Sequence, residues 1–452
     1  MEASEVSSPP YDLAIFGASG FTGKYVIREA IKFLSSSTSP LKTMAIAGRS
    51  ESKLTAALNW AASNSPRPNV PIITADVSDP ASLLALCSQT KLILNCVGPF
   101  RLYGAPVVAA CAQTGTDYLD ISGEPEFMER MEIEHHEKAK ESGSLIVSAC
   151  GFDSVPAELG LMFNSRRWGG PSAPNRVLAF LSLESQKRMV GNFATYESAI
   201  LGVANVGNLQ ALRRLRPKRA RPMIPGSPPP KEQLITYNKD IGLWGIKLPS
   251  ADSVVVRRTL ASHAENPSGL PGRDETPGQA SKRSTFWSSV KPAHFGVKMA
   301  SKSLLTIIRF ILVGIFIGLL GKLSWGRWLL LNFPRVFSLG IFSRRGPSEE
   351  EVASASFKMW FVADGYIDVE EIKDREAKHD AKIVTRVTGP EVGYVATPII
   401  LVQCALIVLS GRNGLPKGGV YPPGIVFGAT DLQQRLQENG FSFDVVSVHN
   451  CK

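Results

Sequence analysis

The sequence predicts an α/β fold, in which a doubly wound parallel sheet at the N-terminus is followed by a mixed α+β domain. Short apolar runs alternate with helical patterns through residues 1–150. Strands that are separated by crossover helices indicate a parallel sheet with helices on both faces. The predicted strands are Asp12–Phe16, Thr43–Ala47, Val70–Thr74, Leu92–Val97, Tyr118–Ile121 and Ser144–Ser148.

Residues 151–388 have a different pattern, which predicts the second, mixed domain. Long irregular stretches at 213–230 and 266–284 are rich in proline, glycine and charge, so we expect mobile loops there. Residues 389–452 are expected to form a third, helical segment. The elements predicted in these two parts are strands Asn175–Leu183, Phe357–Ala363 and Ala381–Thr388, and helices Phe193–Ala204, Pro398–Leu409 and Thr430–Asn439.

Charge is unevenly distributed along the 452 residues. Residues 208–345 hold 23 Lys and Arg against 6 Asp and Glu, while the whole chain has a net charge of +10. The basic residues therefore belong to one insert in the second domain. Such asymmetry favours an anionic partner, either a membrane or a nucleic acid.

The six cysteines and the N-terminus indicate a reducing compartment. No two cysteines form a CxxC pair, and several lie in apolar runs, so we predict reduced thiols and no zinc or other metal site. His135 and His136 are adjacent and would point in different directions on a helix. The first eleven residues contain Glu2 and Glu5 and no arginine, so no signal peptide is predicted.

A glycine-rich motif, GASGFTG, joins the first predicted strand to a helical pattern. Glycines at this junction allow a tight turn, close approach of backbone N–H groups to a pyrophosphate, and close packing of the helix on the sheet. The alternative is a strand-to-helix turn with no ligand. The residues predicted to bind a dinucleotide here are Gly17, Ala18, Ser19, Gly20, Phe21, Thr22 and Gly23.

The ends of the next strands indicate which dinucleotide binds. The second strand is followed by Arg49 and Ser50 rather than by a carboxylate, and a guanidinium suits the 2′-phosphate of NADP. We therefore predict NADP, with NAD as the alternative. Further predicted contacts follow the third and fourth strands, at Asp76, Val77, Asn95, Val97, Gly98 and Pro99. Asp76 would serve equally well as a helix cap, and the Gly-Pro turn as a rigid loop.

Several motifs together resemble the saccharopine dehydrogenase-like oxidoreductases. They are GASGFTGKYV (17–26), AGRSESKL (47–54), NCVGPFRLYGAPVVAAC (95–111), GTDYLDISGE (115–124), CGFDSVPAELG (150–160), TGPEVGYVATPIILVQCAL (388–406) and GGVYPPGIVFG (418–428). The resemblance covers most of the chain apart from the middle insert. It implies a Rossmann-type NAD(P) domain, a mixed second domain, and a C-terminal segment that returns to the first. It also implies NAD(P)-linked hydride transfer, without naming a substrate.

Hydride transfer needs positioning and a proton donor or acceptor. Tyr103, Asp120, Glu124 and Asp153 follow late strands of the predicted sheet and are our catalytic candidates. Each has a structural alternative, since Asp120 and Glu124 would also suit helix caps and Asp153 a turn. Tyr394 is expected to pack, or to close the site from the C-terminal segment.

The stretch 302–333 is strongly apolar and is flanked by cations and tryptophans. Phe310–Gly321 is uncharged but too short to cross a bilayer as a helix. Flanking lysines, arginines and tryptophans are typical of a segment that lies on a membrane or lipid-droplet surface. A buried helix pair or a homodimer interface is the alternative. We do not expect nucleic-acid binding, because the basic run 213–221 has no interleaved aromatic residues.

These observations predict a membrane-associated NAD(P)-dependent oxidoreductase. Its substrate would be a lipid-like small molecule that carries an enoyl, carbonyl or imine group. It would act in a reducing compartment, at the cytosolic face of an organelle, a lipid droplet or a mitochondrion. Two alternatives stay open: a non-catalytic membrane-bound scaffold that keeps the nucleotide site, and a saccharopine dehydrogenase of lysine metabolism.

Overall fold

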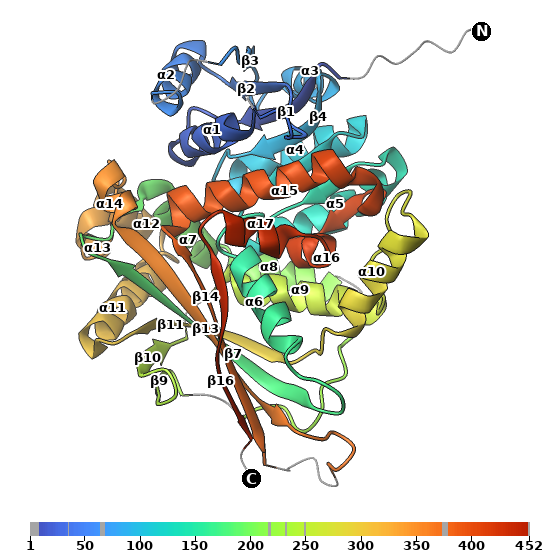
Figure 1. Cartoon of the computed structure of the whole chain (residues 1–452). Helices are drawn as coiled ribbons and strands as arrows, with labels where there is room; N and C mark the ends of the chain where they lie inside the picture. The colour runs from blue at the N-terminus through green and yellow to red at the C-terminus, as the bar shows by residue number, and fades with distance from the viewer. Residues whose placement is uncertain are drawn as a thin grey trace.

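The computed structural model describes residues 9–34, 36–63, 68–215, 218–230, 233–247, 250–372 and 378–450. Two seven-stranded sheets dominate it, one in each domain. In Figure 1 the first sheet lies at the top and the second extends below it. The predicted fold class is confirmed.

The first sheet is parallel throughout, in the order β15-β6-β5-β4-β1-β2-β3. Its strands alternate between two cores: Leu13 and Ile15 of β1 face one, and Ala14 and Phe16 face the other. Burial on both faces is expected for a doubly wound sheet. The strands are β1 Tyr11–Phe16, β2 Met44–Gly48, β3 Ile72–Thr74, β4 Thr90–Asn95, β5 Asp117–Asp120, β6 Leu145–Val147 and β15 Gly419–Tyr421.

Helices connect these strands and cover the two faces. Each begins close to the carboxyl end of the preceding strand, which places the helix N-termini along one edge of the sheet. The helices are α1 Phe21–Leu34, α2 Glu51–Ala61, α3 Pro80–Ser88, α4 Phe100–Thr114 and α5 Pro125–Ser142. The next helix, α6 Val155–Ser165, follows β6 but packs on the second sheet.

The second sheet is mixed, with the order β16-β14-β13-β7-β11-β10-β9. Only β7 and β11 pair in parallel among its described strands, and the other pairs are antiparallel. The strands are β7 Ala173–Ser185, β9 Ile235–Asn238, β10 Leu243–Ile246, β11 His294–Ser301, β13 Ala355–Tyr366, β14 Ala381–Pro390 and β16 Ser442–Asn450. A small separate sheet pairs β8 Gly191–Asn192 with β12 Phe342–Ser343.

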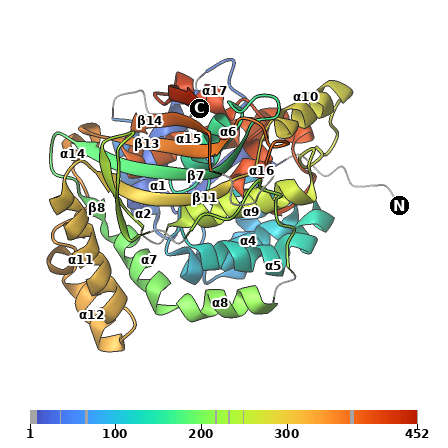
Figure 2. The same cartoon turned by 90° about the horizontal axis from the view of Figure 1, so that it is seen from below.

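The helices of the second domain lie on both sides of its sheet, with α11 on one side and α9 and α10 on the other (Figure 1). Figure 2 shows α11 and α12 along one flank, with α7 and α8 continuing along the same edge. These helices are α7 Phe193–Ala204, α8 Val206–Leu215, α9 Ala251–Glu265, α10 Pro277–Ser288, α11 Leu304–Leu320, α12 Ser324–Asn332, α13 Pro334–Phe337 and α14 Glu349–Ala353.

The C-terminal segment contributes to both sheets. After a π-helical turn at Val392–Ala396, α15 (Thr397–Gly411) crosses between the two domains (Figure 1). It is followed by a short turn Arg412–Gly414, strand β15, helices α16 Pro423–Phe427 and α17 Leu432–Glu438, and strand β16. Our expectation of a purely helical segment is therefore wrong, because β16 pairs with β14. Much of β16 is exposed at the sheet edge, so its apolar pattern is faint in the sequence.

Within the described residues, Val392–Gly414 is the one helical stretch long and apolar enough to cross a bilayer. Most of it is buried against the rest of the protein, as the core helix of a folded domain is. Leu304–Leu320 is apolar but shorter.

The two predicted mobile loops are largely ordered, which corrects that expectation. In the first, the Asn175 side chain donates hydrogen bonds to the carbonyl oxygens of Pro225 (2.6 Å) and Ser227 (3.0 Å). The second contains the start of α10, where Thr276 and Gln279 form a capping box. Pro277 stands at the first position of α10. Proline is well tolerated at the start of a helix, so this proline indicates a helix start and not a loop. Residues 216–217 lie outside the described residues.

Candidate active site

The carboxyl ends of β1, β4, β5 and β6 meet at one edge of the first sheet, because the strands are parallel neighbours. Open α/β sheets bind ligands at this edge. The loops that follow these strands carry most of the predicted site residues. The arrangement therefore brings the glycine loop, the Gly98–Pro99 turn and the acidic loops to one side of the domain.

The glycine loop is sterically constrained at two of its three glycines. Gly17 has φ +79°, and a Cβ on it would lie 2.6 Å from Cγ2 of Val97. A Cβ on Gly23 would lie 2.3 Å from the carbonyl oxygen of Gly17. Both contacts are shorter than real Cβ atoms allow, so these glycines let α1 pack closely against the turn. The turn itself is closed by the Gly20 N–H, which donates to the Gly17 carbonyl at 2.9 Å.

The same loop fits a pyrophosphate. Ser19 and Gly20 are exposed, and α1 starts at Phe21 with no acidic residue in its first turn. The first N–H groups of a helix lack partners within that helix, and its dipole attracts negative charge. Thr22 lies partly buried in this first turn, whereas Ala18 is fully buried beneath the loop. The loop therefore forms a tight turn whose exposed N-terminal side would also suit a pyrophosphate.

The C-terminal segment packs against this loop. The Phe21 ring meets the Tyr394 ring edge-on, with centroids 4.7 Å apart. The Tyr394 hydroxyl accepts a hydrogen bond from the Asn192 N–H at 3.0 Å, and burial raises the pKa of that hydroxyl. Tyr394 thus joins the glycine loop to the second domain as a packing residue.

The region after β2 and β3 is open to solvent. Arg49 is exposed, and Ser50 caps α2 by accepting from the Lys53 N–H. Asp76 accepts from both the N–H and the hydroxyl of Ser78, which lowers the pKa of its carboxyl. Val77 is partly buried beside it. Arg49 is exposed and could contact a 2′-phosphate, whereas the Asp76 carboxylate accepts hydrogen bonds within its own turn.

A buried polar network lies beneath the edge of β4 and β5. Asn95 donates to the Tyr118 hydroxyl at 3.0 Å, and Tyr118 donates to Asp120 at 2.8 Å. The other Asp120 oxygen accepts from the N–H groups of Ser122 and Ala149, both at 2.9 Å. Burial nevertheless raises the pKa of the Asp120 carboxyl to about 6. The side chains of Asn95 and Asp120 therefore organise the loops and do not face the open edge.

Glu124 acts as a cap for a different helix. Its carboxylate accepts from the N–H groups of Phe100 and Arg101 at the start of α4, from the Arg101 Nε at 3.0 Å, and from the Ser198 hydroxyl at 3.1 Å. This buried carboxylate ties α4 and α7 to the start of α5. Tyr103, in contrast, lies 40% exposed on α4.

The turn between β4 and α4 contains the remaining predicted cofactor contacts. Gly98 is exposed, Val97 is partly buried and Pro99 is buried as the residue before α4. The Val97 N–H donates to the Asn95 side chain at 3.0 Å. Among the predicted contacts in this turn, Gly98 and Val97 therefore offer surface to a ligand and Pro99 does not.

Asp153 is the acid best placed for chemistry. It is accessible to solvent, yet the protein surrounds its carboxyl closely enough that burial raises the pKa. Its Oδ2 would lie 2.9 Å from a Cβ on Gly123, in the loop after β5. No described side chain or N–H donates a hydrogen bond to this carboxyl, so Asp153 remains a candidate for proton transfer.

Two further buried carboxyls lie behind Asp153, and the sequence did not reveal them. Burial, with the Asp153 charge, raises the pKa of Asp252 to about 7. Burial raises the pKa of Glu158 to about 8, although Glu158 accepts from the Gly424 N–H at 2.9 Å and from the Thr259 hydroxyl. Asp252 belongs to α9 in the basic insert, where no motif marks it. The only sequence signal for Glu158 is an acid within the otherwise apolar run VPAELG.

Comparison with known proteins identifies the family. A model described as the saccharopine dehydrogenase NADP-binding domain matches residues 13–147. A protein of Arabidopsis thaliana described as a probable mitochondrial saccharopine dehydrogenase-like oxidoreductase is 62% identical over 449 residues, which cover 99% of each chain. The chain belongs to the saccharopine dehydrogenase-like oxidoreductase family. The resemblance predicted from the motifs is confirmed.

Two more distant family comparisons bear on localisation and fold. A lipid droplet localized protein of Caenorhabditis elegans is 31% identical, over 97% of this chain and 99% of its own. The apo structure of a histidine-tagged, L-Glu-forming saccharopine dehydrogenase of Saccharomyces cerevisiae aligns over 97% of this chain and 100% of its own. That alignment has a TM-score of 0.51 at 12% identity, so it supports the fold alone.

The predicted cofactor of this saccharopine dehydrogenase-like oxidoreductase is confirmed as NADP by the domain match. The residues present fit it, because the glycine loop leaves room for a pyrophosphate and Arg49 stands free after β2. In the described part of the chain, no group of three or more His, Cys, Asp or Glu side chains is arranged to hold a metal ion.

We expect Arg49→Glu to weaken NADPH binding by about 10- to 100-fold, the range for losing a charge-assisted hydrogen bond. NADH binding should change little, because NADH lacks the 2′-phosphate. Calorimetric titration with both nucleotides measures the effect. Arg335→Glu, at an exposed arginine on α13, is the control for the change in net charge. An equal loss for both nucleotides would show that Arg49 does not select NADP.

Glu158 should make stability depend on pH. Its pKa in the folded protein, about 8, lies above the ordinary value of 4.5, so folding favours its protonated form. This stabilisation is complete below about pH 4.5 and is lost as the pH rises through about 8. Glu158→Gln should therefore gain stability relative to the wild type between pH 5 and about 8, measured by denaturant unfolding at each pH.

The control for Glu158→Gln is Glu141→Gln, which removes an exposed carboxylate from α5. A stability difference between Glu158→Gln and wild type that stays constant across this pH range would contradict the assignment.

Proposed function

We propose that this oxidoreductase works at a membrane or lipid-droplet surface and transfers a hydride between NADP(H) and a lipid-like substrate. The reacting group of the substrate would be an enoyl, carbonyl or imine. The observation that carries the proposal is the exposed apolar face of the α11–α12 hairpin, residues 304–332.

The hairpin packs through a narrow inner face only. Ile307, Val313 and Leu330 are buried, and Leu330 shares a small core with Tyr196 and Ile200 of α7. The outer face leaves Leu305 77% and Leu319 67% exposed. The other exposed apolar residues of this region are Leu304, Ile308, Leu312, Ile315, Leu323, Trp325, Trp328, Phe333 and Val336.

A continuous apolar face of this kind favours a membrane over water. Large exposed apolar patches mark interaction sites in folded proteins. The 17 residues of α11 measure about 26 Å, less than the roughly 30 Å of a bilayer core. Exposed tryptophans at 325 and 328 suit the interface between lipid and water. The hairpin therefore suits insertion into one leaflet or a lipid monolayer, without crossing it.

The polar groups of the hairpin are arranged to permit this insertion. Arg309 donates to the Leu339 carbonyl oxygen, and Arg327 donates to the carbonyl oxygens of Gly321 and Lys322, both at 3.3 Å. The two guanidinium groups thus satisfy backbone acceptors near the hairpin turn and its base. Satisfied acceptors lower the cost of bringing these loops near lipid.

At the site, NADPH would supply the hydride and the chain would supply position and a proton. The glycine loop would hold the pyrophosphate, and Arg49 the 2′-phosphate. Asp153 would donate the proton, because burial raises the pKa of its carboxyl and no described donor competes for its oxygens. That proton would pass to the substrate atom that develops negative charge as the hydride arrives.

Names of relatives agree with a lipid setting. One relative is described as localised to lipid droplets and another as mitochondrial. Both descriptions are compatible with an enzyme that meets its substrate at a lipid surface.

Replacing Leu305 and Leu319 together by Glu should abolish most binding to lipid vesicles in a flotation assay. Two charges placed in the centre of the apolar face carry a large cost in hydrocarbon. The matched control is Val446→Glu with Val448→Glu, which adds the same charge at exposed positions on the far edge strand β16. Equal loss in both variants, or no vesicle binding by the wild type, would contradict the membrane proposal.

Asp153→Asn should lower the turnover number for NADPH oxidation by about 10²- to 10⁴-fold with long-chain enoyl or carbonyl substrates, and leave NADPH affinity unchanged. Asp274→Asn, at an exposed acid in the loop before α10, is the control. Full activity of Asp153→Asn would remove Asp153 from the mechanism. Turnover with saccharopine alone would favour lysine metabolism, and NADPH binding without any turnover would favour the scaffold.

A further inference from the structure

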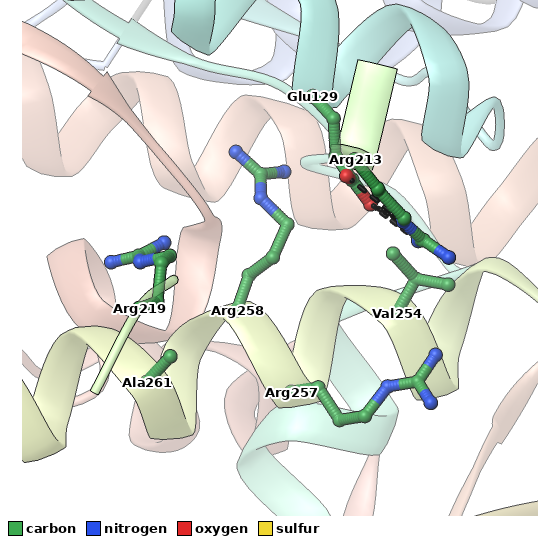
Figure 3. A pocket seen from close by; sticks show the side chains of 7 residues that line it. All are labelled: Glu129, Arg213, Arg219, Val254, Arg257, Arg258 and Ala261. Carbon is green, nitrogen blue, oxygen red and sulfur yellow. Dashed lines mark hydrogen bonds and ion pairs between the residues drawn. The ribbon is translucent and has the colours of Figure 1, made fainter. Parts of the chain in front are cut away.

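A hollow lined by four arginines lies between α5, α8 and α9. Figure 3 shows the guanidinium groups around a floor that includes Val254 and Ala261. Its volume is about 190 Å³, which corresponds to roughly six water molecules at about 30 Å³ each. The lining residues are Glu129, Arg213, Arg219, Val254, Arg257, Arg258 and Ala261.

Three of the arginines are paired with carboxylates. Arg213 forms a forked pair with Glu129, in which its Nε lies 3.0 Å from Oε1. Arg258 donates to Glu132 at 2.8 Å, and Arg219 to Glu265 at 2.6 Å. These pairs fix the three guanidinium groups in place, and that of Arg219 is fully used, since its Nη1 also donates to Glu132 at 3.3 Å.

Positive charge remains unbalanced in the described surroundings of the hollow. Arg257 forms no hydrogen bond or ion pair with a described residue, and no dashed line reaches it in Figure 3. Arg258 is only 6% exposed, yet its Nη1 is buried without a hydrogen-bond partner. A buried guanidinium donor without an acceptor is costly. Burial and the neighbouring Arg213 also lower the pKa of Arg257.

We propose that the arginine hollow binds a phosphate group. A phosphate offers several acceptor oxygens and negative charge, which match forked guanidinium donors from more than one direction. It would neutralise Arg257 and lie beside the guanidinium groups of Arg213 and Arg258, which line the same hollow. The small volume and the absence of an aromatic side chain from the lining disfavour stacked bases of a nucleic acid.

The phosphate has two plausible sources, a phospholipid head group and a soluble phosphate ester. The lipid source rests on the proposed membrane association. α8 contributes Arg213, has no buried residue along its described length, and exposes Val206 and Leu215. α7 precedes α8 directly and packs on both α11 and α12. Figure 2 shows α12, α7 and α8 along one edge, so a membrane that receives the hairpin would bring head groups towards the hollow.

The test uses the full-length protein with two kinds of probe. Phosphatidylcholine vesicles are doped with phosphatidic acid or, at equal surface charge, with a fatty acid. Inorganic phosphate and glycerol 3-phosphate are titrated by calorimetry in the absence of lipid. Arg257→Gln removes the unpaired charge at the rim, and Arg214→Gln removes an exposed arginine of α8 that does not line the hollow.

For a lipid phosphate we expect tighter binding to phosphatidic acid than to fatty-acid vesicles, and a loss of about tenfold in Arg257→Gln but not in Arg214→Gln. For a soluble phosphate ester we expect the same Arg257-dependent loss in calorimetry, without a preference between vesicles. Equal effects of both variants, or no phosphate preference with either probe, would overturn the proposal. If the protein bound no vesicles at all, membrane association would be contradicted. The calorimetric titration would then decide whether the arginine hollow binds phosphate.

Discussion

The burial of α15 between the two sheets is the constraint on which the rest of the structure depends. Every residue from Thr397 to Val408 is buried, whichever side of the helix it occupies. A helix that is apolar all round can be stable in water only when protein covers every face. The first sheet and its helices cover one side of α15, and the C-terminal helix α17 and its strand lie on another. This helix would expose apolar surface to water if the two domains separated, so its burial holds them together.

This constraint also positions the site. The turn before α15 places Tyr394 on the glycine loop, and the Thr397 hydroxyl accepts the Phe152 N–H at 3.1 Å in the loop that carries Asp153. One segment therefore contacts both the predicted pyrophosphate loop and the loop of the predicted acid. Loops at a ligand-binding edge are otherwise the mobile part of an α/β domain. Here a buried helix fixes the spacing between the residue that would hold the cofactor and the residue that would move the proton.

The sequence predicted the fold where periodicity and composition agree. The six strands of the first domain are found within a few residues of their predicted ends, and Phe193–Ala204 is a helix over the whole predicted range. Buried parallel strands are continuous apolar runs, which composition shows clearly. The strands β9, β10, β11, β15 and β16 escaped prediction. Most of them are short or lie at a sheet edge, whereas β11 is longer but only partly buried and carries His294, Gly296 and Lys298 among its apolar residues.

The candidate site was less accessible to prediction, because its acids look alike in the sequence and differ only in their surroundings. Glu124 and Asp153 each follow a strand of the same sheet, yet one caps a neighbouring helix with four donors and the other has none among the described residues. Asp252 and Glu158 come from α9 and α6, which lie far apart in the sequence and meet only in the fold. Which carboxyl is free to exchange a proton is decided by the number of donors around it, and donors from distant segments leave no local pattern.

The basic insert divides into two parts with different physical functions. In the α11–α12 hairpin, Arg309 and Arg327 turn towards backbone carbonyl oxygens, and the exposed surface is left apolar. Around α8 and α9, arginines instead face one another across a hollow, and carboxylates from α5 hold them apart. Hydrocarbon would tolerate the first arrangement, and a bound anion would relieve the second. A lipid surface would offer both, with acyl chains beside head-group phosphates, so the two proposals are compatible with one membrane-facing insert.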